Sequence, residues 1–306
     1  MGNNITTPAR GVVLRRIPAT AVSDLVHCLS EARPIVQAIF LLRFLTGAAL
    51  GYTAGTDIAT VAFGAFSWEC AVVFVYLLNG TSDVLADRVN GSRRPIASGA
   101  LPRRTALRYA RVSGLLALAC GLGMGAEFFV AVAGFLALGY LYSAPPFQLK
   151  NNSGATIAVV VLGGLMTYLA GSVSAGEGGG LPQLLCAVAM SLWMGLVGAV
   201  TKDFGDVDGD RAAGRRTVAV LLGERGARHL VALLAPVLGL AFMGAALHLA
   251  PVLVAAAWVT LLGALVVAGL TLASPGGGRA ARRQPYRAFM TTQYGSHAGV
   301  LVGLAL

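Results

Sequence analysis

About nine apolar stretches of this chain are each long enough to cross a lipid bilayer as a helix. A spanning helix needs about 20 mostly apolar residues to cross the ~30 Å hydrocarbon layer. The predicted spans cover residues 34–54, 58–79, 104–122, 125–144, 153–174, 181–200, 228–249, 251–273 and 289–306. Glycine is abundant at 40 residues, and small residues let membrane helices approach closely. We therefore expect an all-α fold, a polytopic bundle of nine transmembrane helices around a central cavity.

The composition indicates a protein that lies in a lipid bilayer rather than one that binds nucleic acid. Hydrophobic residues make up 56% of the chain and charged residues only 12%, about half the charged fraction of a soluble domain. The formal net charge of +10 could suggest a nucleic-acid-binding protein. The basic residues follow the predicted loops, however, so we expect no nucleic acid partner. The sequence carries no signal of an oligomeric state.

The basic residues also predict an orientation in the membrane. Of the 23 lysine and arginine residues, only Arg43 lies deep within a predicted span. The others cluster in alternate connections, and the loops between those connections contain neither lysine nor arginine. By the positive-inside rule, the N-terminus is cytoplasmic and the C-terminus lies outside. We expect a cytoplasmic N-terminal segment over residues 1–33 and a transmembrane domain over residues 34–306.

Two acidic motifs interrupt the apolar pattern, and both fall on the predicted cytoplasmic side. In the first, Asn79, Asp83 and Asp87 recur every four residues at the end of the second span. In the second, Asp206 and Asp210 repeat that spacing, and Asp203 lies one turn earlier. Residues four apart share one face of a helix, so each motif predicts a line of carboxylates on one helical face.

This arrangement is typical of a magnesium site that binds a diphosphate. Mg²⁺ prefers oxygen ligands and usually takes one or two carboxylates together with substrate phosphates. We expect Asp83, Asp87, Asp206 and Asp210 to be catalytic, with Asn79 and Asp203 as further metal ligands. A single Asp at a helix end often only caps the helix. The doubled motif beside basic residues favours metal binding over that alternative.

These motifs and the segments around them resemble the UbiA superfamily of intramembrane prenyltransferases. The resemblance covers span count and motif order over the whole chain. The segments that carry it are Asn79-x-x-x-Asp83-x-x-x-Asp87, Arg94-Pro95-Ile96-Ala97-Ser98-Gly99, Tyr142-Ser143-Ala144-Pro145-Pro146 running to Lys150, and Lys202-Asp203 through Asp206-x-x-x-Asp210 to Gly214 and Thr217. It implies a nine-helix fold whose central cavity lies under a cytoplasmic cap. It also implies Mg²⁺-dependent transfer of a prenyl group from its diphosphate.

Two positions depart from the family's usual pattern. The first motif of the family usually reads Asn-Asp, whereas Gly80 stands in this chain and removes one carboxylate. Many members have Arg two residues before the lysine that follows the fourth span, where Gln148 stands here. Neither change affects the spaced metal positions, and both leave the acceptor open.

Basic and hydroxyl side chains near the aspartates are candidates for binding the diphosphate. Charge-assisted bonds from Arg and Lys are the strong contacts to phosphate. The candidate substrate-binding residues at this end are Arg88, Arg94, Tyr142, Lys150 and Lys202. Basic residues are also expected in cytoplasmic loops for topological reasons alone, and we assign that role to Arg103, Arg104, Arg215, Arg216 and the cluster at 279–287.

Arg43 and Glu69 are ionisable residues inside predicted spans. Each lies about ten residues from the cytoplasmic end of its span, which places both ~15 Å deep. They are therefore predicted as partners, since pairing would offset the cost of burying either charge. One hypothesis is a structural ion pair, and the other is that one of them orients or deprotonates an acceptor in the cavity.

The leading functional hypothesis is a Mg²⁺-dependent integral-membrane enzyme that moves an isoprenoid from its diphosphate to an acceptor. The expected acceptor is an aromatic ring or quinone precursor. Alternatives within the superfamily are a terpene cyclase, which needs no acceptor, and transfer of phosphoribosyl to a polyprenyl phosphate. A transporter is a different class, but transport sites usually lie near the bilayer midplane, whereas these motifs lie at the cytoplasmic edge.

Overall fold

The fold is all-helical, as the sequence predicts. The computed structural model describes residues 21–176, 180–273 and 278–306, and within them the single β-bridge joins Asn152 to Arg216. The long helices are α2 (Pro34–Leu50), α3 (Ile58–Ser82), α6 (Arg103–Gly123), α7 (Ala126–Ser143), α8 (Ser153–Ala175), α9 (Gly180–Leu192), α13 (Gly223–Leu249), α14 (Val254–Ala273) and α16 (Gln284–Ala305). The shorter α-helices are α1 (Ala21–Glu31), α4 (Val84–Val89), α5 (Pro95–Ser98), α10 (Ala199–Asp203), α11 (Val207–Ala212), α12 (Val218–Leu221) and α15 (Arg279–Arg282).

Three other helical turns join or precede these elements. The 3₁₀ turns are η1 (Leu149–Asn151) and η3 (Pro251–Leu253). The π-helical turn η2 (Trp193–Gly198) joins α9 to α10, so that Gly180–Asp203 forms one long helical segment. Single π turns inside α-helices are frequent at functional sites, and this one leads directly into Lys202 and Asp203.

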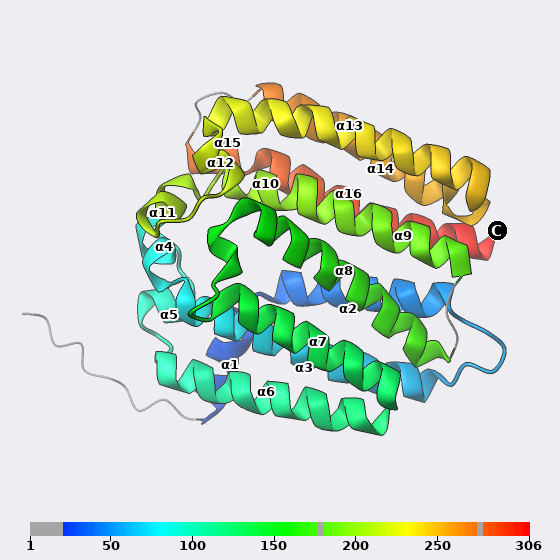
Figure 1. Ribbon diagram of the computed structural model, residues 1–306, viewed down its shortest axis with the longest axis horizontal. Coiled ribbons are helices and arrows are strands. Elements are labelled where there is room, and N and C mark those ends of the chain that lie inside the picture. The colour runs from blue at the N-terminus through cyan, green and yellow to red at the C-terminus, as the bar shows by residue number, and fades with distance from the viewer. Residues whose placement is uncertain (1–20, 177–179, 274–277) are drawn as a thin grey trace, which may run out of the picture.

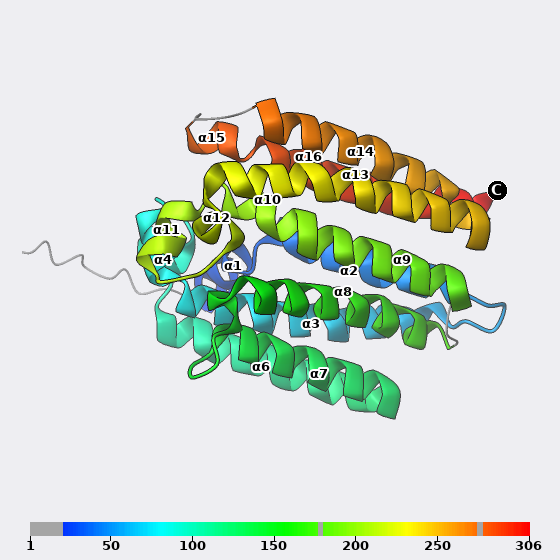
Figure 2. The same cartoon turned by 45° about the horizontal axis from the view of Figure 1, so that its top comes forward.

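The long helices lie side by side, and the short helices gather at one end of the bundle. Figure 1 shows α4, α5, α11 and α12 at the left end, with the C-terminus at the opposite end. Figure 2 shows α4, α11 and α12 at that end from another side. The first acidic motif runs into α4 and the second into α11, so the fold brings the two motifs to the same end of the molecule.

Six helical segments are long and apolar enough to cross a membrane. They are Ile58–Ser82, Ala126–Ser143, Ser153–Ala175, Gly180–Asp203, Gly223–Leu249 and Pro251–Ala273. A seventh is possible if α1 and α2 form one span, although the two helices are bent by 66°. The described residues thus establish fewer spans than the nine that the sequence predicts. Polar and charged residues in α6 and α16, including four arginines in α6, reduce the apolar character of those two helices.

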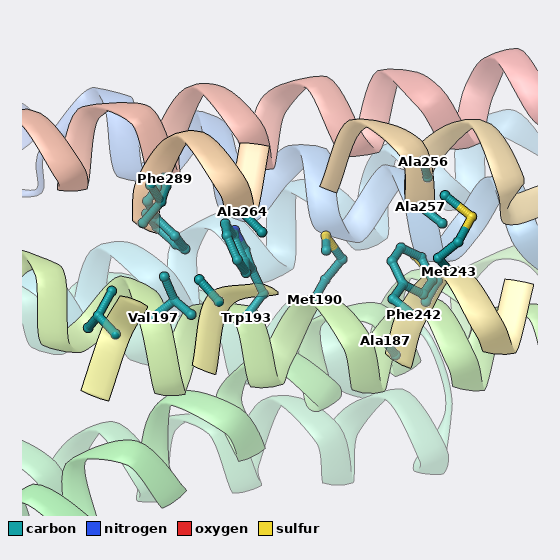
Figure 3. Packing of buried hydrophobic residues seen from close by; sticks show 14 of the residues in the cluster. Ala187, Met190, Trp193, Val197, Phe242, Met243, Ala256, Ala257, Ala264 and Phe289 are labelled. Atoms are coloured by element: carbon teal, nitrogen blue, oxygen red, sulfur yellow. The ribbon is translucent and has the colours of Figure 1, made fainter. Parts of the chain in front are cut away.

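Large aromatic side chains fill the bundle between the helices. Figure 3 shows one cluster, in which Trp193 on η2 and Phe289 on α16 stack with ring centroids 5.5 Å apart. A second cluster surrounds Trp68 on α3, whose ring lies 4.8 Å from that of Phe135 on α7. Close packing in these two clusters fixes the positions of the helices that form the cavity wall.

Glycines let α2 and α8 approach to backbone contact. A Cβ at Gly47 would overlap the carbonyl of Tyr168, and a Cβ at Gly171 would overlap the carbonyl of Phe44. The reciprocal pair explains part of the high glycine content, because close helix crossing in a membrane protein needs small residues at the contact.

Candidate active site

The first acidic motif lies across a break between two helices rather than within one helix. The long helix α3 ends at Ser82, and α4 begins at Val84. The expectation of one uninterrupted helical face is therefore wrong. The (i, i+4) hydrogen bonds continue through the break, since Asp83 N donates to Asn79 O at 3.0 Å and Asp87 N donates to Asp83 O at 2.8 Å. The three side chains consequently stay near one another.

The second motif repeats this arrangement. The helix α10 ends at Asp203, and Asp206 precedes α11 with φ −120° and ψ 6°. Asp206 N donates to Asp203 O at 3.0 Å, and Asp210 N donates to Asp206 O at 2.9 Å. Both motifs thus place carboxylates around a turn between a spanning segment and a short helix.

The two motifs face each other. Asn90, at the end of α4, accepts a hydrogen bond from the backbone of Gly209 on α11 at 2.9 Å, and the absence of a side chain at Gly209 allows that approach. Arg215 then bridges the motifs, because its guanidinium pairs with Asp83 and lies 3.1 Å from Asp210 Oδ1. The predicted opposition of the two carboxylate sets is observed.

Asp83 is the most tightly held carboxylate of the site. Lys150 Nζ lies 2.5 Å from Asp83 Oδ1, and Asn79 Nδ2 donates to Asp83 Oδ2 at 2.8 Å. Burial raises the pKa of Asp83, but Lys150 and Arg215 outweigh burial and lower it to about 2. At Asp210 the balance is reversed: burial raises the pKa more than Lys202 and Arg215 lower it.

Asp87 is held by Arg94, as part of a buried network that reaches α1. Arg94 Nη1 donates to Asp87 Oδ2 at 2.8 Å, and Arg94 Nη2 lies 2.6 Å from Glu31 Oε1. Arg94 therefore occupies a position between two carboxylates, and its neighbouring residues Pro95 and Ile96 begin α5.

Besides the mostly buried Arg215, which pairs with Asp210, the second motif is contacted by two more exposed cations. Lys202 Nζ lies 3.8 Å from Asp203 and 3.9 Å from Asp206. Arg283, whose side chain is 41% exposed, lies 3.1 Å from Asp206 Oδ1. Asp208 is exposed at the surface of α11, as expected from its place between the two spaced aspartates.

A cavity of about 170 Å³ opens between the motifs and extends into the bundle. Its polar end is lined by Arg33, Asn79, Asp83, Tyr142, Lys202, Asp203 and Arg215. The walls beyond are apolar and aromatic, and include Val36, Ile39, Phe40, Val75, Tyr76, Phe135, Leu138, Val160, Met194, Tyr286 and Met290. This shape suits a ligand that has an anionic head and a hydrocarbon tail.

Arg43 lines the cavity and is fixed by a polar network between α2, α8 and α16. With its amide oriented to accept, Gln293 receives hydrogen bonds from Arg43 Nε at 2.9 Å and from Nη2. His297 Nδ1 lies 2.6 Å from Gln293 O, so Nδ1 carries the proton and Nε2 accepts from Tyr168 Oη at 2.7 Å. The Arg43 guanidinium also lies 5.5 Å from the Phe40 ring centroid.

Seven predicted site residues do not line this cavity. Five of them pair with other residues of the site, namely Asp87, Arg94, Lys150, Asp206 and Asp210. The other two, Glu69 and Arg88, lie apart from it. Glu69 is half-buried on α3, its Oε1 has no hydrogen-bond partner, and it is absent from the cavity lining. Among the residues that the structure describes, no ion pair joins it to Arg43. Arg88 is exposed, and its Nε donates to the carbonyl of Ala97 at 3.0 Å. Arg88 thus fixes the turn before α6 rather than facing the cavity.

The structure adds two basic residues that the sequence did not single out. The sequence predicts a purely topological role for Arg215, yet in the structure it joins both motifs. It follows Gly214, whose φ of 70° turns the chain so that Arg215 N donates to Asp210 O at 2.9 Å. Arg33 lies in the break between α1 and α2, with φ 61°, and lines the cavity. At both positions the sequence feature that could have pointed to the site is a basic residue beside a predicted turn.

The oxygen donors of the site suit Mg²⁺ in kind. In the described ranges, no three carboxyl, imidazole or thiol groups converge on one metal position. Mg²⁺ usually takes only one or two carboxylates and completes its shell with phosphates and water. Asp83 of the first motif and Asp203 of the second both line the cavity, so they fit such an ion when a diphosphate supplies the remaining ligands.

Comparisons with known proteins identify the family. The sequence profile described as the UbiA prenyltransferase family matches residues 40–292. The chain is 32% identical to digeranylgeranylglyceryl phosphate synthase of Pyrococcus abyssi over 149 residues, covering 48% of this chain and 51% of that protein. It is also 32% identical to chloroplastic chlorophyll synthase of Oryza sativa over 177 residues, covering 53% and 45%. The matches thus span about half the length of these relatives.

A solved structure has the same fold. A UbiA homolog from Archaeoglobus fulgidus bound to GPP and Mg²⁺ superposes with a TM-score of 0.68 at 20% identity, covering 92% of this chain and 100% of that one. The family profile extends over more than four fifths of the present sequence, from α2 to α16. This chain belongs to the UbiA prenyltransferase family.

Proposed function

We propose that this protein is a Mg²⁺-dependent integral-membrane prenyltransferase that transfers an isoprenoid from its diphosphate to an aromatic or quinone-precursor acceptor. The observation that carries the proposal is a cavity in which Asp83 and Asp203, one from each of the opposed motifs, and several basic residues meet an apolar chamber. Relatives named for prenyl-lipid and chlorophyll synthesis, and a structural relative bound to GPP and Mg²⁺, support this class of reaction.

The proposed enzyme crosses the membrane nine times. The helices α6 and α16 run alongside the six apolar segments in Figure 1, and with α2 they complete the count. The distribution of basic residues supports a cytoplasmic N-terminus, an external C-terminus and a cytoplasmic cap formed by the short helices. In this proposal residues 34–306 form the transmembrane domain, and residues 1–33 form a cytoplasmic segment.

The donor's diphosphate would bind at the polar end of the cavity. Lys150, Lys202 and Arg215 already neutralise the aspartates there, and Arg33 and Tyr142 line the same space. An incoming diphosphate would exchange partners with these cations. Mg²⁺, held by Asp83, Asp87, Asp203, Asp206 and Asp210 with Asn79, would supply positive charge that stabilises the departing diphosphate.

The apolar chamber would hold the prenyl tail and exclude water from the allylic cation. When the C–O bond breaks, its electron pair leaves with the diphosphate. A carbon of the acceptor ring forms the new C–C bond, and the ring then loses a proton to the departing diphosphate. Phe40, Tyr76 and Phe135 offer flat surfaces for an aromatic acceptor, and Arg43 would orient it through an anionic or hydroxyl group.

Product identification tests the proposal. Purified protein in lipid is incubated with prenyl diphosphates of several lengths, with and without a panel of aromatic acids, and the products are analysed by mass spectrometry. A prenylated acceptor formed with Mg²⁺ and lost with EDTA is the expected result. A cyclic hydrocarbon or alcohol formed without acceptor would replace the proposal with a terpene cyclase. Release of no diphosphate from any donor would overturn both.

A further inference from the structure

Glu31 is a fully buried carboxylate at the last position of α1, outside every predicted span. Its Oε1 lies 2.6 Å from Arg94 Nη2, and its Oε2 accepts a hydrogen bond from Ile96 N at 3.0 Å. A negative charge at a helix C-terminus opposes the helix dipole, and burying a carboxylate is costly unless it is paired and hydrogen-bonded. The position of Glu31 therefore depends on Arg94 and α5.

The carboxylate of Glu31 occupies space that Gly80 leaves empty. A Cβ built at Gly80 would overlap Glu31 Oε1 and would lie 2.9 Å from Arg94 Nη2. Gly80 is buried and directly follows Asn79 within the first acidic motif. A side chain from α1 thus places a carboxylate inside that motif at the position of a residue that has no side chain of its own.

Arg94 connects this carboxylate to Asp87. Arg94 lies between them, at 2.6 Å from Glu31 Oε1 and 2.8 Å from Asp87 Oδ2. One guanidinium faces two carboxylates, so Glu31, Arg94 and Asp87 together carry a net negative charge, whereas Arg94 and Asp87 alone would carry none. Glu31 also orients the guanidinium, because Arg94 Nη2 donates to the Glu31 carbonyl at 3.3 Å.

We infer that Glu31 is a positioning residue of the active site, which replaces in space a carboxylate at position 80 and sets the charge of the first motif through Arg94. The inference rests on the proposed function, since it assigns Glu31 an effect on Mg²⁺ and diphosphate binding. It makes α1 part of the catalytic unit, although this helix precedes the residues that match the family profile.

The functional test compares Glu31→Gln with wild type in the Mg²⁺ concentration that gives half-maximal diphosphate release. We expect this concentration to rise about tenfold, because Arg94 would then neutralise Asp87 alone. Calorimetric binding of inorganic diphosphate with Mg²⁺ should weaken to a similar extent. The matched control is Asp24→Asn, which removes the other ion pair of α1, at 3.9 Å from the exposed Arg108. The control should behave as wild type.

A double-mutant cycle tests the spatial pairing without any turnover. Glu31→Ala should lower the thermal midpoint of the metal-free protein by about 5 °C or more, since the buried Arg94 loses its ion pair with Glu31. Gly80→Asp alone should also destabilise, because its Cβ overlaps Glu31. In the combined variant Glu31→Ala/Gly80→Asp, the new carboxylate can reach Arg94. We expect the thermal midpoint and the calorimetric binding of inorganic diphosphate with Mg²⁺ both to recover substantially.

The two proposals fail in different ways. Wild-type protein that releases no diphosphate would refute the proposed function, while the thermal cycle would still report on the Glu31–Gly80 pair. An active wild type with a Glu31→Gln Mg²⁺ requirement equal to that of Asp24→Asn would refute the positioning role. Strictly additive thermal effects in the combined variant would refute the replacement of one carboxylate by the other.

Discussion

The two acidic motifs share a backbone design but differ in how firmly cations hold them. In the first motif, Lys150 approaches Asp83 to 2.5 Å and Arg94 approaches Asp87 to 2.8 Å, with Lys150 and Arg94 both at least nine-tenths buried. In the second motif, Lys202 stays 3.8 and 3.9 Å from Asp203 and Asp206 and is 38% exposed.

This difference indicates separate roles for the two motifs. Buried, short ion pairs fix geometry, and breaking one of them leaves an uncompensated charge. Longer pairs to exposed cations contribute little stability and exchange readily with other partners. The first motif is therefore preformed. At the second motif, Lys202 and Arg283 can move to a diphosphate while a metal ion takes their place beside Asp203 and Asp206.

The largest expected effect follows from removing Asp83. Asp83→Ala should lower kcat/KM about 10²–10³-fold, the scale seen when one preorganised charge-stabilising group is lost. It should also destabilise the protein by about 3–5 kcal/mol, because Lys150 and Arg215 lose their shared partner. Asp206→Ala should lower activity but leave the thermal midpoint almost unchanged.

Asp208→Ala is the matched control for both variants, since Asp208 is exposed on the same short helix as Asp210. It should retain wild-type activity and stability. Equal destabilisation by Asp83→Ala and Asp206→Ala would contradict the distinction between a preformed and an exchangeable motif.

The next effect concerns the bridge between the motifs. Arg215→Ala should lower kcat/KM about 10–100-fold, because it removes the cation that holds Asp83 opposite Asp210. The control is Arg216→Ala, one residue away, whose side chain is exposed. Steady-state kinetics of diphosphate release would measure both. Similar losses in the two variants would show that only the net charge of the loop matters.

Much of this site could be predicted from the spacing of a few residues. Four-residue repeats of Asp in a chain of apolar spans predicted two carboxylate sets facing one cavity, and the structure brings them together through Arg215. The sequence did not reveal the breaks at Asp83 and after Asp203, because the (i, i+4) pattern continues through both turns.

The roles of other residues could not be predicted. The sequence indicates how deep in the membrane a residue lies and on which side, but not which neighbouring helix its side chain faces. The depth estimate placed Arg43 level with Glu69, yet Arg43 points toward α16, where Gln293 accepts from it. Arg215 and Arg33 lie in loops where basic residues are expected for topology alone. The place of Glu31 beside the first motif depends on the packing of α1 against Gly80, and no spacing in the sequence indicates that contact.

A moderate effect is expected on stability at acid pH. The pKa of Asp83 is lowered to about 2 from an ordinary 3.8, so the unfolded chain binds the proton more tightly than the folded protein. The resulting stabilisation, about 2 kcal/mol, is complete above pH ~4 and is lost as pH falls toward 2. Thermal midpoints of wild type and Asp83→Asn should converge over that window. A constant difference would mean that the ion pairs of Asp83 do not stabilise the fold.

The smallest effect is expected at Arg88, the predicted diphosphate ligand that the structure places outside the cavity. Arg88→Ala removes one hydrogen bond from an exposed side chain to the Ala97 carbonyl, so stability should change by about 0.5 kcal/mol or less. Its kcat/KM should stay within about twofold of wild type, since a phosphate ligand would cost far more. Lys150→Ala, measured beside it, should lose most activity because Lys150 contacts Asp83 directly. A large rise in KM for the prenyl diphosphate in Arg88→Ala would mean that this arginine turns into the site when the donor binds, and that the first motif is less rigid than its buried ion pairs indicate.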